Sequence, residues 1–174
     1  MCWKHLIKAL QGRGQVMDEI DLLKRELVLE NQRCMELYMS KVLEEDSLFT
    51  QSVFIEVIIR LNYILQKLNN YCRVTWTDDI QLVGGIKDIT DLVNKLRNAI
   101  CHIDSKLNNL RETTTKLTFN IVRRGFINTV KSGSQKIRND YNDDIAFYYG
   151  EFRIYLKRHI ERLVKELPRV IHSL

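Results

Sequence analysis

Proline is nearly absent from this chain, and glycine is scarce. Its 174 residues include one proline and seven glycines, so long segments lack the residues that interrupt helices. All-β sandwiches and barrels need many turns and therefore many of both residues, which argues against them. The length and the 45% apolar composition suit a single globular domain over residues 1–174. We therefore expect a mainly helical protein.

Long apolar runs and paired cysteines are also missing. The most apolar stretch, residues 53–65, is interrupted by Glu56 and Arg60, whereas a membrane span needs about 20 apolar residues. The opening segment MCWKHLIKALQGRG lacks the apolar core of a signal peptide. The four cysteines form no CxxC pair, which argues against a zinc site or a disulfide framework. We expect a cytoplasmic protein that has reduced thiols and binds no membrane, metal or cofactor.

Three helices are predicted before residue 104, because apolar residues recur there at helical spacing. The first covers residues 16–45. The second follows a cap at Asp46-Ser47, is apolar on more than one face, and should be the buried central helix. The third covers residues 86–103 and follows the Gly84-Gly85 break. Together they indicate a helical bundle.

The next segment departs from this pattern. Residues 113–115 are all threonine, and glycine occurs at 125 and 133. Apolar residues alternate at Leu117, Phe119 and Ile121. These features predict a small β-hairpin or an irregular excursion. From residue 143 onward the helical spacing returns up to Leu167, and Pro168 should stop or kink that last helix. The expected fold is four or five helices with one β excursion before the last helix.

Among the four histidines, His102 has the most suggestive neighbours. His5 and His172 lie near the ends of the chain, and His159 follows two basic residues, which predicts a solvent-facing stripe. His102 instead closes the segment Arg97-Asn98-Ala99-Ile100-Cys101-His102. An imidazole can move protons near neutral pH, and a guanidinium can hold a phosphate. The segment is therefore our candidate site.

Helical geometry limits how these side chains can meet. Asn98 and His102 are four residues apart and share a face, whereas Arg97 and His102 differ by about 140° around the axis. One helix alone does not bring the arginine and the histidine together. A two-fold dimer that packs this helix against its copy could set both pairs around one cleft.

Arginine and histidine without a cluster of metal ligands suit metal-independent cleavage of RNA. The ribose 2′-hydroxyl provides the nucleophile, so the protein needs only to move protons and stabilise charge on the phosphoryl group. His102 could act as base or acid, Arg97 could bind the phosphate, and Asn98 could orient either the imidazole or the phosphate. DNA lacks the 2′-hydroxyl and would not react. The net charge of +5 permits an RNA partner without indicating one.

This segment resembles the signature of the HEPN superfamily, an arginine and a polar residue followed after a short interval by a histidine. The resemblance implies a four- to five-helix bundle and a homodimer with the signature helices at its interface. It also implies a metal-independent endoribonuclease that leaves 2′,3′-cyclic phosphate and 5′-hydroxyl ends. Arg97, Asn98 and His102 would be its catalytic residues. Many members are toxins of toxin–antitoxin or antiviral defence systems, which would make an antitoxin protein a further partner.

Two other interpretations of the segment stay open. A non-catalytic HEPN-type module could use the same groove to bind RNA, a nucleotide or a partner protein. Alternatively, the chain could be a helical scaffold in which Arg97 and Asn98 are solvated and His102 caps the helix. Cleavage of RNA, and its loss when the imidazole is removed, would separate these possibilities.

Other candidates have a simpler structural interpretation. Residues 153–159 repeat the arginine–histidine spacing, but apolar Ile154 follows the arginine. Asp78-Asp79 and Asp143-Asp144 precede helical patterns, so we expect them to cap helices. Cys101 should be a small, apolar-facing thiol. A group of tyrosines near basic residues could stack on RNA or belong to the core; its members are Tyr141, Tyr148, Tyr149 and Tyr155.

Overall fold

Helices make up most of the structure. The computed structural model describes residues 3–102, 104, 106–109, 116, 118–123 and 137–174, and side chains from residue 19 onward. Within these ranges lie four α-helices: α1 (Trp3–Met39), α2 (Thr50–Leu68), α3 (Ile89–Cys101) and α4 (Arg162–His172). A three-stranded antiparallel sheet completes the fold; it consists of β1 (Asn120–Arg123), β2 (Ile145–Tyr149) and β3 (Phe152–Tyr155). The predicted mainly α class is confirmed.

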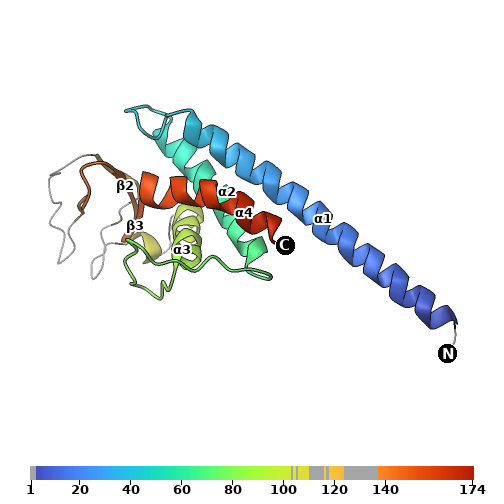
Figure 1. Cartoon of the computed structure of the whole chain (residues 1–174). Coiled ribbons are helices and arrows are strands. Elements are labelled where there is room, and N and C mark those ends of the chain that lie inside the picture. Colours follow the sequence, from blue (N-terminus) through green and yellow to red (C-terminus); the bar gives the residue numbers. More distant parts are fainter. Residues whose placement is uncertain (1–2, 103, 105, 110–115, 117, 124–136) are drawn as a thin grey trace.

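The C-terminal part of α1 packs against the rest of the molecule. Among the side chains described from residue 19 onward, its buried positions begin at Leu27 and recur at Asn31, Cys34 and Tyr38, which is one stripe of a helix. Its N-terminal part extends past α2 and α4 (Figure 1). The helix ends at Met39, earlier than the predicted residue 45.

The connection between α1 and α2 explains both boundaries. Lys41 has a positive φ of 64°, which is incompatible with a continuing helix. The Thr50 hydroxyl donates to the Val42 carbonyl at 3.1 Å, which folds the connection back onto the start of α2. Ser47 accepts the N–H of Phe49, but α2 begins only at Thr50, three residues after the predicted cap.

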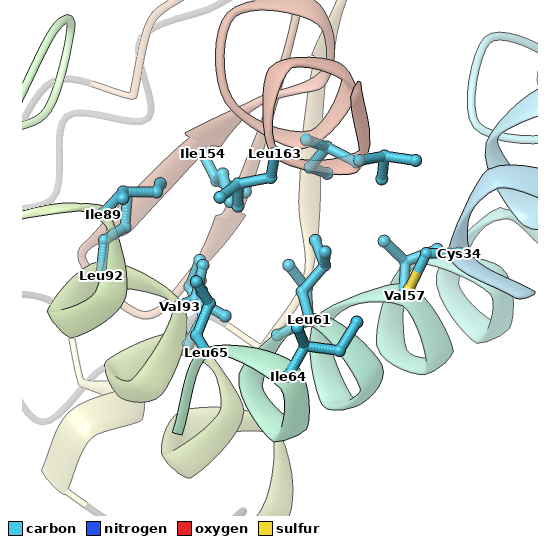
Figure 2. Close-up of a cluster of buried hydrophobic side chains, with 14 of the residues drawn as sticks. Cys34, Val57, Leu61, Ile64, Leu65, Ile89, Leu92, Val93, Ile154 and Leu163 are labelled. Atoms are coloured by element: carbon cyan, nitrogen blue, oxygen red, sulfur yellow. The ribbon is translucent and has the colours of Figure 1, made fainter. Parts of the chain in front are cut away.

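The core lies between α2, α3, α4 and the inner face of the sheet. The helix α2 buries a wide face against α1, α3 and α4, as expected for the central helix. In Figure 2, side chains of α2 such as Leu61 and Leu65 point toward Val93 of α3, Ile154 of β3 and Leu163 of α4. These apolar contacts determine which face of α3 remains outside.

The segment 145–155, predicted to be helical, is a β-hairpin. Strand β2 pairs with β3 so that Phe147 lies opposite Ile154 and Tyr149 opposite Phe152. These residues face the main core, whereas their neighbours Ala146 and Tyr155 face a second apolar cluster. Both faces are buried, so the apolar residues form a near-continuous run whose positions also fit a helix. Helical structure resumes only at the π-helical turn η2 (Leu156–Glu161), which leads into α4.

Pro168 lies inside α4, which continues to His172. The sequence predicts that this proline stops or kinks the helix, and the first of these two alternatives is wrong. Because proline has no N–H, the carbonyl of Val164 lacks its usual helical donor. The amide of Asn31, on α1, donates to that carbonyl at 3.1 Å. A side chain from another helix thus satisfies the carbonyl that the proline leaves.

Part of the expected β excursion is confirmed, and part falls outside the described residues. Ile121 belongs to β1, which pairs with β2. Residues 113–115, Leu117 and the glycines at 125 and 133 are not among the described residues. In the part of the chain that the structure describes, no helix is long and apolar enough to cross a membrane.

Candidate functional site

The start of α3 is held firmly by side chains. Asp88 is its N-cap, and the carboxylate of Asp88 accepts the backbone N–H of Asp91 at 2.9 Å. The Arg73 guanidinium donates to Asp88 at 2.8 and 2.9 Å and to Asp91 at 2.6 Å. Thr90 donates its hydroxyl to the Val74 carbonyl at 2.7 Å. Burial raises the pKa of Asp88, but the Arg73 contacts and the accepted backbone N–H together outweigh it and hold the pKa below its usual range.

One face of α3 is buried, and this orients its polar face. The buried positions include Leu92, Val93, Leu96 and Ile100, all of which belong to the main core. They recur at the spacing of an amphipathic helix. The polar positions of the opposite face are half-buried, and in the last turn Ala99 and Ile100 are buried while Cys101 and the following His102 are exposed. That turn carries the residues that the sequence singled out.

The structure brings two of the three predicted catalytic residues into direct contact. Arg97 is half-buried, and its guanidinium donates to the Asn98 side-chain oxygen at 3.1 Å. His102 is exposed and lies just beyond the last helical residue. Among the described residues no hydrogen bond joins the His102 imidazole to Arg97 or Asn98. Asn98 is therefore placed to orient the guanidinium rather than the imidazole of the same chain.

The backbone of His102 is fixed at both ends. Its N–H donates to the Asn98 carbonyl at 3.1 Å, and its φ of −124° and ψ of 74° end the helix. The side-chain amide of Asn108 donates to the carbonyls of Ala99 at 3.0 Å and His102 at 2.9 Å. Asn108 belongs to a short 3-10 turn, η1 (Lys106–Asn108), and is fully buried. The exposed imidazole thus projects from a well-anchored backbone.

The other histidines do not form a comparable site. His159 is fully buried, so its predicted place in a solvent-facing stripe is wrong. Its Nδ1 accepts the Tyr155 N–H at 3.1 Å, and its Nε2 lies 3.1 Å from the Asp78 carbonyl, to which it donates. Burial lowers the pKa of His159 to about 4. His172 is exposed on the last turn of α4, and the His5 side chain lies outside the described part.

The second arginine–histidine match is also internal. Only 6% of the Arg153 side chain is exposed, and its guanidinium donates to Asp140 at 2.6 Å. It also lies over the ring of Tyr155, with its central carbon 4.8 Å from the ring centroid. Because both Arg153 and His159 are buried in the protein, this pair offers nothing to a substrate. Of the two matches, the Arg97 segment alone reaches solvent.

The two aspartate pairs, predicted to cap helices, have different roles in the structure. Asp144 is buried and caps η2, twelve residues further on, by accepting the N–H groups of Lys157 at 2.8 Å and Arg158 at 3.0 Å. Asp78 caps no helix and instead accepts from the Arg162 guanidinium at 2.8 Å. The capping role is thus confirmed for Asp144, although the hairpin intervenes, and is wrong for Asp78.

Most of the tyrosine group belongs to the core. Tyr148, Tyr149 and Tyr155 are buried, so they cannot form an RNA-stacking surface. Tyr141 is half-buried, and the Arg158 guanidinium lies 3.6 Å from its ring centroid. A similar stack of Arg162 on Trp76, with 4.2 Å to the centroid, was not predicted. Both arginines also pair with aspartates, so this surface carries little free positive charge.

Neither of two surface pockets includes the candidate residues. One of about 580 Å³ lies between the sheet and the α1–α2 connection; its lining includes Glu44, Arg123, Asp143 and Lys157. The other, of about 400 Å³, lies between α1 and α2; its lining includes Glu26, Glu30, Glu56 and Arg60. Acidic and basic groups share each pocket. Neither therefore presents the set of basic groups that would attract a phosphate.

The cysteines and possible metal ligands offer no alternative centre. Burial raises the pKa of Cys34 to about 12, which keeps it an unreactive thiol. Cys101 is exposed, contrary to the expectation of an apolar-facing thiol. In the described ranges, no group of three or more His, Cys, Asp or Glu residues could hold a metal ion.

Comparison with known proteins identifies no relative. The chain matches no protein-family model, no curated protein and no solved structure. What α3 does must therefore be inferred from its own side chains and their surroundings.

Proposed function

We propose that the protein is a metal-independent endoribonuclease of the HEPN type, built on a HEPN-like helical bundle. One observation at the end of α3 carries the proposal. The Arg97 guanidinium is hydrogen-bonded to the Asn98 side chain, and His102 is exposed while its backbone is held by hydrogen bonds. An oriented guanidinium and an accessible imidazole are the two groups that cleavage through the 2′-hydroxyl requires.

The reaction assigns a separate task to each group. The 2′-oxygen loses its proton to one imidazole and forms a bond to phosphorus, while the bond from phosphorus to the 5′-oxygen breaks. A second imidazole gives a proton to the departing 5′-oxygen, leaving a 2′,3′-cyclic phosphate and a 5′-hydroxyl. Arg97 stabilises the charge that builds up on the non-bridging oxygens. Asn98 accepts from the Arg97 guanidinium and so keeps it in one orientation.

A homodimer provides the second imidazole. Attack and departure take place on opposite sides of the phosphorus, so one His102 does not serve both steps in the same turnover. A two-fold axis beside the end of α3 would place His102 and Arg97 of each copy in a common cleft. We therefore propose RNA and a second copy of this chain as partners. A cytoplasmic toxin or defence role, with a neutralising antitoxin, follows from the HEPN resemblance.

The first test measures cleavage without free metal. Purified protein is incubated with total RNA in excess chelator, and the ends are tested for cyclic phosphate. His102→Ala should lower the rate by about 10²- to 10⁴-fold, and Arg97→Ala by about 10²- to 10³-fold. A 2′-deoxy substitution at the cleaved nucleotide should stop the reaction.

The chain offers matched controls on α4. Its last turn also carries an arginine and a histidine, Arg169 and His172, and both are exposed. Their alanine variants should cut RNA at the wild-type rate. Equal cleavage by all four variants would overturn the proposed site. RNA binding without cleavage would instead support the non-catalytic HEPN-type module.

The second test concerns the dimer. Sedimentation at micromolar concentration should give twice the mass of the chain. Adding excess His102→Ala protein to wild type tests the shared cleft, because mixed dimers then hold only one His102 and should lose cleavage. An active monomer would refute the composite site.

A further inference from the structure

The turn between β2 and β3 is pressed against the segment that follows α3. Gly150 and Glu151 form a two-residue turn, because Tyr149 pairs directly with Phe152. Gly150 has a positive φ of 58°, a conformation that suits glycine. A Cβ at this position would lie 2.0 Å from the Leu107 carbonyl oxygen and 3.2 Å from the Asn108 Cα. Glycine is thus needed both for the turn and for this close approach.

The segment in contact with Gly150 is the one that holds His102. Asn108 directly follows Leu107 in η1. Its buried amide donates to the carbonyls of Ala99 and His102. These are carbonyls at a helix end, where intrahelical donors have run out. A chain of contacts therefore runs from the hairpin turn through η1 to the backbone of His102.

We infer that Asn108 is the positioning residue for His102 and that the Gly150 turn holds Asn108 in place. The inference rests on the proposed ribonuclease function of α3. The exposed imidazole has no side-chain partner among Arg97 and Asn98, so its direction depends on its backbone. Asn108 and Asn98 fix the His102 carbonyl and N–H, respectively. Such preorganisation matters because a 1 Å displacement of a reacting group costs about 10²-fold in rate.

The amide of Asn108 is needed specifically as a donor. Its NH2 group donates to two carbonyl oxygens, which only accept. Asn108→Asp keeps the shape but sets a carboxylate against two carbonyls. Burial and these acceptors raise the pKa of the introduced carboxyl, so the side chain regains one donor when it is protonated.

The kinetic test compares variants with wild type on the same RNA. Asn108→Asp and Gly150→Ala should lower kcat by about 10- to 100-fold and change KM less than about threefold, because Arg97 still meets the phosphate. The deficit of Asn108→Asp should shrink as the pH is lowered, whereas that of Gly150→Ala should not. Gly85→Ala is the matched control, since Gly85 also has a positive φ, 83°, but no atom within 4 Å of its Cβ position. It should retain wild-type kcat.

A second measurement does not depend on activity. Hydrogen exchange of the His102 amide, which is bonded to the Asn98 carbonyl, should be at least about tenfold faster in Gly150→Ala and Asn108→Asp than in wild type and Gly85→Ala. Asn108→Ser, a milder change, serves the same purpose if a stronger variant does not fold. Unchanged exchange, or faster exchange with wild-type kcat, would overturn the inference. If the wild type cuts no RNA, the proposed function fails. The anchoring of His102 is tested separately, because His102 amide exchange in the variants equal to that of wild type would refute it whether or not RNA is cut.

Discussion

Acid should destabilise this protein through His159, a buried histidine that the fold keeps neutral. The unprotonated Nδ1 accepts the Tyr155 N–H, and the protonated Nε2 donates to the Asp78 carbonyl. A second proton would have no acceptor at Nδ1. Burial, the main cause, lowers the pKa of His159 from 6.5 to about 4. Asp79 and Asp144 favour the charged form and only partly offset burial.

The size of the effect follows from the two pKa values. In the unfolded chain the imidazole binds its proton near pH 6.5, but in the folded chain only near pH 4. The stabilisation is therefore complete above pH 6.5 and is lost as the pH falls toward 4. At pH 5 the loss from this one residue is about 2 kcal/mol, and at lower pH it approaches about 3 kcal/mol.

Urea unfolding at pH 7 and pH 5, followed by circular dichroism, measures this loss. In His159→Gln the amide provides one donor and one acceptor but does not titrate. Its free energy of unfolding should fall by about 2 kcal/mol less than that of wild type between the two pH values. His172→Gln, at an exposed position on α4, should follow wild type. Parallel curves for wild type and His159→Gln would refute the assignment of a neutral buried imidazole.

Two further predictions concern polar groups that close helix ends, and urea unfolding at pH 7 tests both. Asp144→Ala removes the buried cap of η2 and should cost about 2–3 kcal/mol, whereas Asp143→Ala, at an exposed neighbour, should cost less than about 0.5 kcal/mol. Asn31→Ala leaves the Val164 carbonyl without a donor and should cost about 1–2 kcal/mol. Pro168→Ala restores the helical N–H, so Asn31→Ala should cost less than half as much in that background. Additive costs would show that Asn31 does not compensate for the proline.

The helices that could be predicted are those with one buried face. In α3, Leu92, Leu96 and Ala99 lie inward while Arg97 and Asn98 do not, so the spacing of apolar residues reports the structure directly. The same spacing in residues 145–156 was misleading. There both faces of the sheet are buried, so nearly every residue is apolar. Apolar residues at helical spacing can be picked out of such a run whether or not it is a helix. Gly150, between two such runs, is the local signal that could have identified the turn.

His159 was misplaced for a related reason. Of its two basic neighbours, Lys157 is exposed, whereas Arg158 is half-buried and is bound by Asp143 and Asp144. A charged triplet indicates a solvent-facing stripe only if the helix has regular geometry. Here the π-helical turn η2 changes which positions face inward, and Asp144 binds its first N–H groups.

The candidate site shows the same division between local and distant information. Arg97, Asn98 and His102 could be named from the sequence because they lie within one helix and its cap. The hydrogen bond between Arg97 and Asn98 joins neighbours in the chain, so the sequence implies their proximity. What holds His102 comes from elsewhere. The Asn108 amide reaches back six residues, and Gly150 approaches from the hairpin.

These distant contacts also explain why a short motif alone is weak evidence for catalysis. Any exposed helix end can carry an arginine and a histidine, and the last turn of α4 does so with Arg169 and His172. There the backbone ends in ordinary helical geometry at Ser173, with a φ of −79°. At the end of α3, by contrast, a buried amide spans two carbonyls, and a glycine turn packs against its segment. If alanine variants at the end of α3 lower the rate of RNA cleavage and those at the end of α4 do not, this anchoring is the physical difference between the two helix ends that explains the result.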